Sequence, residues 1–145
     1  MHLDHVFGNL FITEKYGVLP LAHQADEILL DNFEQQLSFF GLEMTDRAQP
    51  LGGYLTENNV IKIGNDCLKI LHVPGHSLGS LCFYSETTNA VWVGDVLFRQ
   101  SIGRTDLQGG DYAQLIKGIT KKLFNLPNDT IVYSGHGPIT QIGFE

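Results

Sequence analysis

Three apolar runs in this chain end in the same way, with a glycine beside a histidine or an aspartate. They are residues 67–73 before Pro74-Gly75-His76, residues 90–93 before Gly94-Asp95, and residues 130–133 before Gly135-His136-Gly137. Binding groups of α/β proteins favour the loops at the carboxyl ends of strands, and glycine lets the backbone turn sharply and a ligand come close. We therefore predict that His76, Asp95 and His136 point at a common centre.

A second group of polar side chains lies at the start of the sequence, in His2-Leu3-Asp4-His5. With the strand-end residues it gives six candidate metal ligands: His2, Asp4, His5, His76, Asp95 and His136. Imidazole and carboxylate suit zinc, iron or manganese, whereas a structural zinc site of the cysteine type would need thiolates. Six ligands are too many for one tetrahedral ion, so the pattern favours two ions bridged by Asp95. Taken singly, each motif also fits solvated or capping loop residues.

The rest of the pattern predicts one α/β domain spanning residues 1–145. Helical spacing and helix-ending glycines predict helices over residues 6–16, 24–40 and 112–124, the last with Asp111 as its N-cap. Short β-rich runs predict strands over residues 17–22, 60–63, 67–73, 80–84, 90–93 and 130–133. Residues 44–59 contain Pro50, Gly52 and Gly53 and are predicted to form an irregular loop. Trp92 is expected in the core.

The composition limits which classes of partner and which compartment we expect for this protein. The net charge of −7 leaves no basic patch for phosphates, so a nucleic-acid partner is not expected. The sequence has no apolar run of membrane length and no basic-then-apolar start typical of a signal peptide, so we expect no membrane association and a cytoplasmic protein. Cys67 and Cys82 form no CxxC pair and are expected to be buried thiols in a reducing compartment.

Five short motifs occur in a fixed order: HLDH at residues 2–5, PGHSLGS at 74–80, GDVLF at 94–98, GRTD at 103–106 and SGHGP at 134–138. In this combination, through essentially the whole chain, the sequence resembles the metallo-β-lactamase superfamily. It is most similar to the glyoxalase II-like members, which are hydroxyacylglutathione hydrolases and their short relatives. The resemblance implies the αβ/βα sandwich of that superfamily.

The resemblance also implies which candidate ligands would bind each of two metal ions. The family motif is HxHxDH, and HLDH matches its second half; the first His would lie two positions before His2, outside this sequence. We therefore expect an N-terminally truncated member, whose uncovered sheet surfaces favour a homodimer. The family pattern implies that one ion uses His2, His76 and Asp95. The other would use Asp4, His5, Asp95 and His136.

The implied activity is hydrolysis of a small thioester or related ester by a metal-activated hydroxide, with zinc as the expected metal and iron or manganese as alternatives. Asp4 would serve both as ligand and as the catalytic residue that orients the nucleophile. Arg104 and Asp106 would support a metal ligand or pair with each other. Phe98 and Arg99 could line the substrate entrance.

Alternatives remain open at this point. They are a persulfide dioxygenase with a single iron, a lactonase, a β-lactamase, and a truncated metal-binding fragment without catalytic activity. Ser77 lacks the GxSxG context of a nucleophile. His23 is expected to occupy a loop or capping position, and His72 is expected to be a packed or half-exposed strand residue.

Overall fold

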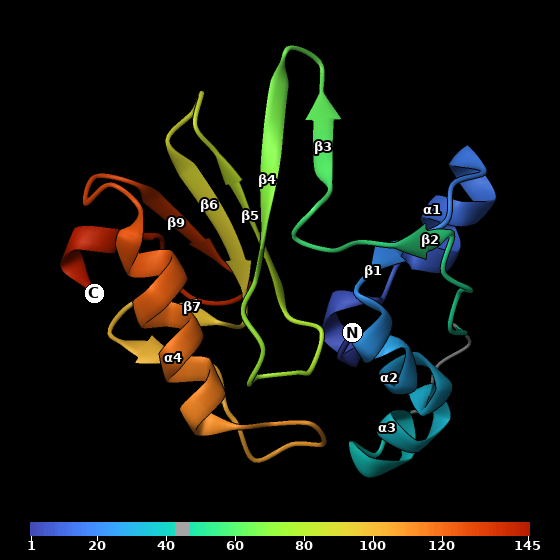
Figure 1. Ribbon diagram of the computed structural model, residues 1–145. Helices are drawn as coiled ribbons and strands as arrows, with labels where there is room; N and C mark the ends of the chain where they lie inside the picture. The colour runs from blue at the N-terminus through green and yellow to red at the C-terminus, as the bar shows by residue number, and fades with distance from the viewer. Residues whose placement is uncertain (43–46) are drawn as a thin grey trace. The chain divides into compact units, whose positions relative to one another are not determined.

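The computed structural model describes residues 1–42 and 47–145 (Figure 1). The chain groups into two compact units, Met1–Leu55 and Thr56–Glu145. Helices and a β-sheet are both present, so the predicted α/β class is confirmed.

The first unit is mainly helical. Its elements are a 3-10 helix (Leu3–His5), α1 (Asn9–Tyr16), β1 (Leu21–Ala22), a 3-10 helix (Gln24–Asp26), α2 (Glu27–Asp31), α3 (Phe33–Phe39) and β2 (Gly53–Tyr54). β1 and β2 pair in parallel. A small core gathers the buried side chains of Leu3, Val6, Leu30, Phe33 and Leu37. Burial of Leu3 and Val6 fixes the polypeptide on either side of Asp4 and His5.

Several element boundaries in this unit differ from the prediction. The helix expected over residues 24–40 is divided, because Asn32 has φ −93° and ψ 17°, outside the helical region. The helix expected over 6–16 begins only at Asn9, whereas its end at Tyr16 is as predicted, with Gly17 (φ 66°) as the C-cap. The strand expected over 17–22 is reduced to β1, and β2 lies within the predicted loop 44–59. Residues 44–46 of that loop are outside the described residues.

The second unit contains a six-stranded sheet in the order β10-β9-β6-β5-β4-β3. The strands are β3 (Val60–Ile63), β4 (Asp66–His72), β5 (Leu81–Ser85), β6 (Ala90–Gly94), β9 (Ile131–Ser134) and β10 (Thr140–Gln141). The small hairpin of β7 (Leu97–Phe98) and β8 (Ser101–Ile102) follows β6. α4 (Tyr112–Lys122) continues into a 3-10 helix (Leu123–Asn125), and a 3-10 helix (Ile142–Phe144) ends the chain.

Strand direction explains why the polar strand ends meet. β5 is antiparallel to both β4 and β6, so β4 and β6 run the same way. β9 is parallel to β6, with Gly94 paired to Ser134. The carboxyl ends of β4, β6 and β9 therefore lie at one edge of the sheet, as the sequence pattern predicted. The β6–β9 register shifts between Trp92 and Gly94, a type of irregularity that re-aims the next side chain.

α4 packs against one face of this sheet (Figure 1). Its side chains Leu115 and Ile119 join a core with Leu123, with Val73 just after β4, and with the strand residues Cys82, Val91, Val93 and Val132. The predicted N-cap is confirmed, since the Asp111 carboxylate accepts a hydrogen bond of 2.9 Å from the backbone N–H of Gln114. This carboxylate therefore satisfies one of the helix's otherwise unpaired N-terminal donors.

Two burial predictions in this unit were wrong. Cys82 is buried as expected, but Cys67 is exposed. Cys67 pairs with Lys62 near the tip of the β3–β4 hairpin, which extends past α4 (Figure 1). Trp92 is 40% exposed and stacks on Tyr133, with ring centroids 5.5 Å apart. It faces away from the side of the sheet covered by α4, because the neighbouring Val91 and Val93 are the core residues.

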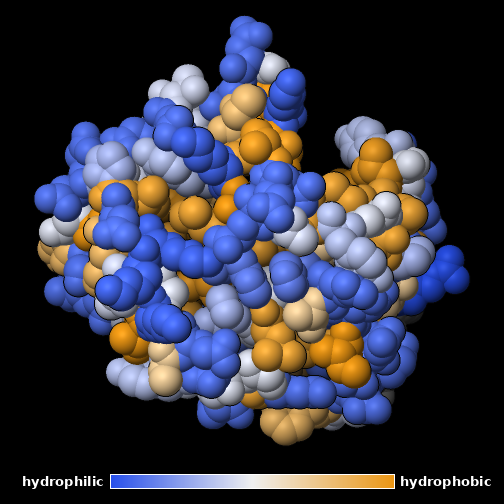
Figure 2. Space-filling model, viewed as in Figure 1, coloured by the Kyte–Doolittle hydropathy of each residue, from blue (hydrophilic) through white to orange (hydrophobic). Residues whose placement is uncertain are grey.

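Across residues 1–42 and 47–145, no helix combines the length and the apolar character needed to cross a membrane. The face shown in Figure 2 carries hydrophilic side chains with hydrophobic ones between them. Exposed aromatic residues include Phe11, Tyr16 and Phe39, all in the first unit.

Candidate metal centre

Asp95 lies between two histidines at the edge of the sheet where β4, β6 and β9 end. Its Oδ2 atom is 3.8 Å from His76 Nε2 and 3.6 Å from His136 Nε2. Two ligands that bind one tetrahedral ion at about 2.1 Å lie roughly 3.4 Å from each other. The three predicted strand-end residues therefore lie together, at separations near those of ligands on a shared ion.

The three side chains differ in their access to solvent. His76 and Asp95 have side-chain exposures of 9% and 14%, whereas His136 has 56%. The Phe98 ring lies beside His136, with centroids 6.4 Å apart. Among these three side chains, His76 and Asp95 are thus largely buried and His136 is exposed to solvent.

A backbone carbonyl fixes the orientation of the His76 ring. His76 Nδ1 lies 2.8 Å from the carbonyl oxygen of Arg104. A carbonyl only accepts hydrogen bonds, so Nδ1 carries the hydrogen. In the neutral ring, Nε2 then presents its lone pair toward Asp95. Metal-binding histidines characteristically donate their second N–H to such an acceptor, so this donor set fits a divalent metal ion.

Glycines make the turns around these residues possible. Gly75 has φ 130°, and a Cβ atom there would clash with the backbone of Leu115 and Asp111. Gly94 has φ 53°, and its carbonyl accepts a 2.8 Å hydrogen bond from the N–H of Gly135. The loops after β6 and β9 are therefore joined directly, immediately beside Asp95 and His136.

In the first unit, Asp4 and His5 lie together within the short 3-10 helix. Asp4 Oδ2 is 3.7 Å from His5 Nε2, and both side chains are partly exposed. His2 stands at the N-cap position of that helix. The predicted ligands are thus divided between the units, with His2, Asp4 and His5 in the first and the other three in the second.

Arg104 and Asp106 form a two-point ion pair. Arg104 Nε and Nη2 donate to the two carboxylate oxygens of Asp106 at 2.7 and 2.8 Å. The hydrogen bond from Arg104 lowers the pKa of Asp106 to about 2. The contact from this pair to the candidate centre is made by the backbone of Arg104, not by its charged side chain. Sequence reasoning singled out both residues, but a carbonyl contact has no signal in side-chain chemistry.

Three other polar residues considered from the sequence, His23, His72 and Ser77, make contacts with nearby backbone or hydroxyl groups. His23 Nδ1 accepts a 3.2 Å hydrogen bond from the N–H of Ala25, which confirms the predicted capping role. His72 lies in β4, with Nε2 2.8 Å from the Leu78 carbonyl. Ser77 is buried, and its hydroxyl lies 2.8 Å from that of Ser80. These contacts account for the three side chains without a metal or a covalent intermediate.

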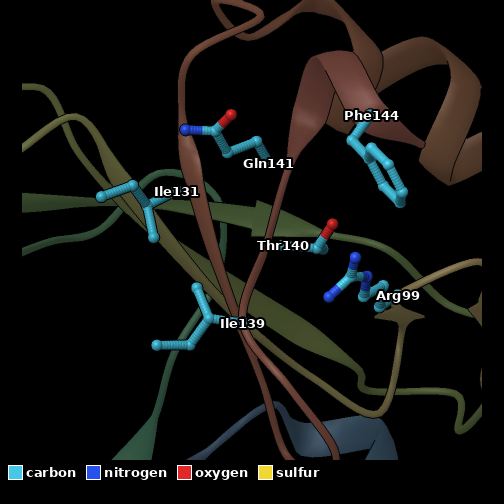
Figure 3. A pocket seen from close by; sticks show the side chains of 6 residues that line it. All are labelled: Arg99, Ile131, Ile139, Thr140, Gln141 and Phe144. Atoms are coloured by element: carbon cyan, nitrogen blue, oxygen red, sulfur yellow. The ribbon is translucent and has the colours of Figure 1, made fainter.

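A separate hollow of about 330 Å³ lies at the β9–β10 end of the sheet (Figure 3). It is lined by Arg99, Ile131, Ile139, Thr140, Gln141 and Phe144. The Arg99 guanidinium lies over the Phe144 ring, 5.1 Å from its centroid. The six lining residues include none of the predicted metal ligands. Arg99 thus lines this hollow.

Comparison with known proteins agrees with the motif assignment. The family model of the metallo-beta-lactamase superfamily matches residues 1–136. The hydroxyacylglutathione hydrolase GloC of Haemophilus influenzae is 37% identical over 145 residues, which cover 99% of this chain and 68% of that protein.

Solved structures show the same relationship. The crystal structure of BLEG-1 B3 metallo-beta-lactamase has a TM-score of 0.89 and 37% identity. That of TTHA1623 in a di-iron-bound form has a TM-score of 0.86 and 34% identity. Each alignment covers 99% of this chain and 69% of the other. The predicted fold is therefore confirmed, and this chain belongs to the metallo-beta-lactamase superfamily, whose members include metal-dependent hydrolases.

Proposed function

We propose that this chain hydrolyses a small thioester, as the glyoxalase II-like members of its superfamily do. The observation that carries the proposal is the cluster of His76, Asp95 and His136, in which the Arg104 carbonyl turns the lone pair of His76 Nε2 toward Asp95. The likeness to a hydroxyacylglutathione hydrolase supports the thioester class.

We propose the ligand assignment that the family pattern implies. One ion would be held by His2, His76 and Asp95, and the other by Asp4, His5, Asp95 and His136. Asp95 would be shared by both sites, as a carboxylate has two oxygen donors. Zinc suits these donors, and iron or manganese suits them as well. The di-iron form of TTHA1623 supports iron as the alternative.

Such ions, when bound, polarise a carbonyl and lower the pKa of water, which supplies the nucleophile and stabilises the developing charge. The chain's own residues contribute position and access. Asp4 would orient the attacking water through its carboxylate. The substrate carbonyl would approach from the side of His136, whose side chain is 56% exposed. A thiolate leaves without a strong acid, so the reaction needs no buried proton donor.

The proposed activity implies a small-molecule substrate. A nucleic-acid partner is not proposed, because the net charge of −7 disfavours binding to phosphates. A homodimer remains a proposal, which sedimentation of the purified chain would test.

The test combines metal content with turnover. The purified chain is expected to contain divalent metal by elemental mass spectrometry and to release thiol from a hydroxyacyl thioester of glutathione. Asp95→Asn is expected to lower kcat/KM by about 100-fold or more and to lower the metal content, because a neutral amide is a poor ligand. Asp129→Asn is the matched control, since Asp129 is exposed in the turn before β9.

The same preparation decides between the alternatives. Turnover of a cephalosporin without thioester hydrolysis would assign the activity named for BLEG-1. Oxygen consumption with a persulfide and one iron per chain would assign a dioxygenase. Metal that depends on Asp95 without turnover of any substrate would identify a metal-binding fragment. Absence of bound metal after incubation with zinc, iron and manganese would overturn the proposal.

A further inference from the structure

The segment of residues 103–111, between β8 and α4, is fastened to the turn that carries His76. Its first attachment is the carbonyl of Arg104, which lies 2.8 Å from His76 Nδ1. Its second is the backbone N–H of Asp111, which donates a 2.8 Å hydrogen bond to the carbonyl of Gly75. Gly75 and His76, two successive residues of the turn, are therefore each hydrogen-bonded to one end of the same loop.

Glycine brings this segment close to the centre. A Cβ atom on Gly103 would clash with the carbonyl oxygen of Asp95 and would lie 3.1 Å from His76 Nδ1. At the other end, a Cβ atom on Gly110 would clash with the carbonyl oxygen of Thr105. Only glycine therefore fits at positions 103 and 110 without a shift of the neighbouring backbone. A larger residue at position 103 would displace the Arg104 carbonyl from His76.

The ion pair shapes the part of the segment that carries this carbonyl. The Arg104 side chain is 57% exposed and binds both oxygens of Asp106, two residues further on. A two-point guanidinium–carboxylate contact restricts geometry more than a single contact does. Its two partners lie on either side of Thr105, so the pair closes a tight local ring. The carbonyl of Arg104 points away from this ring to His76.

We propose that residues 103–106 form a positioning clamp for His76. The Arg104 carbonyl holds the His76 proton on Nδ1, and the Arg104–Asp106 pair holds that carbonyl in place. The clamp rests on the proposed function only in that Nε2 of His76 is a metal ligand. Arg104 and Asp106 are positioning residues, because they act through His76.

The first test reads the ring directly and needs no metal. In long-range 1H–15N spectra of the metal-free protein, His76 is expected as the Nδ1–H form. His72 provides an internal control of opposite sign, because its Nε2 faces the Leu78 carbonyl and is expected to carry the hydrogen. Observation of His76 in the Nε2–H form, or as an even mixture, would overturn the proposal.

The second test removes the pair without changing its size. Asp106→Asn is expected to weaken zinc binding several-fold, less than the ~10-fold or more expected for losing the direct partner of a metal ligand, because Asp106 acts on His76 only through Arg104. It should also reduce the Nδ1–H preference of His76. Glu86→Gln is the matched control, since Lys69 and Glu86 form an ion pair of similar exposure, 55% and 64%, on β4 and after β5. This control is expected to leave both readouts unchanged.

Unaltered zinc affinity and an unaltered His76 spectrum in Asp106→Asn would contradict the clamp. If that variant does not fold, as judged by circular dichroism, Arg104→Gln replaces it, and the wild-type spectrum decides the tautomer by itself. If the wild-type chain binds no zinc, the proposed function fails, while the metal-free spectra of wild type and variant still decide the clamp.

Discussion

His76 and His136 are two histidines with the same neighbour and different surroundings. Each places Nε2 within 4 Å of Asp95 Oδ2, at 3.8 and 3.6 Å, and each follows the end of a strand. His76 is buried and bound to a backbone carbonyl, whereas the side chain of His136 is 56% exposed. Equal distance to a partner thus does not mean equal constraint. The protein thus fixes one of these two candidate ligands by a hydrogen bond and leaves the other exposed to solvent.

The largest difference is expected between the glycines beside the two histidines. Gly75→Ala should destabilise the metal-free protein by about 3–5 kcal/mol, because it adds a steric clash to an unfavourable positive φ. Gly137→Ala has a positive φ of 78° but meets no atom within 4 Å, so it should cost only about 1–2 kcal/mol. Urea denaturation with unchanged m-values measures both. Equal losses would refute the asymmetry.

Replacing the histidines themselves should also cost more stability at position 76 than at position 136, with a smaller difference than for the glycines. His76→Ala is expected to destabilise the metal-free protein by about 2–4 kcal/mol, because it leaves a cavity at a buried side chain and removes the hydrogen bond to the Arg104 carbonyl. His136→Ala should change stability by less than about 0.5 kcal/mol, as exposed substitutions usually do. Both should weaken metal binding. A large stability loss in His136→Ala would show that its loop is as constrained as that of His76.

The smallest effect concerns pH. The pKa of Asp106 is lowered to about 2 by Arg104. Because the pKa in the folded state lies below the ordinary value of 3.8, the pair stabilises the fold fully above that value and loses this contribution as the pH falls through 2. NMR of the Asp106 carboxyl carbon in the metal-free protein should show a midpoint near 2. In Arg104→Gln the midpoint should return toward the ordinary range, and a midpoint that does not move would exclude Arg104 as the cause.

The sheet was predictable from sequence because its strands alternate and are bounded by turn residues. Residues 60–63 match β3 without a shift, and the ends of β4, β6 and β9 carry the polar groups that the pattern assigned to them. The first unit was less predictable. Periodicity marked residues 24–40 as one helix, but it carries no information about the backbone angles of Asn32 that divide it.

Part of the candidate centre was also beyond sequence reasoning. Side-chain chemistry identified His76 as a ligand candidate, but its constraint comes from a main-chain carbonyl 28 residues away. Any residue type offers that carbonyl, so only the path of the backbone places it. Burial of Cys67 was wrongly predicted for a related reason, since its strand extends past the helix that covers the sheet. The contact of His76 and the exposure of Cys67 both depend on the path of the backbone in the folded chain, which local composition does not determine.

The parallel pairing of β6 and β9 has a consequence for the order in which the chain folds. The hairpins β3–β4 and β4–β5 join neighbouring segments, whereas β9 reaches β6 only after α4 has crossed the sheet. Closing such a long loop is entropically costly and slow compared with hairpin formation. We therefore expect Asp95 and His136 to come together late in folding. If an ion binds both residues as proposed, we expect it to leave the rate of hairpin formation unchanged and to stabilise the sheet only after β6 and β9 have paired.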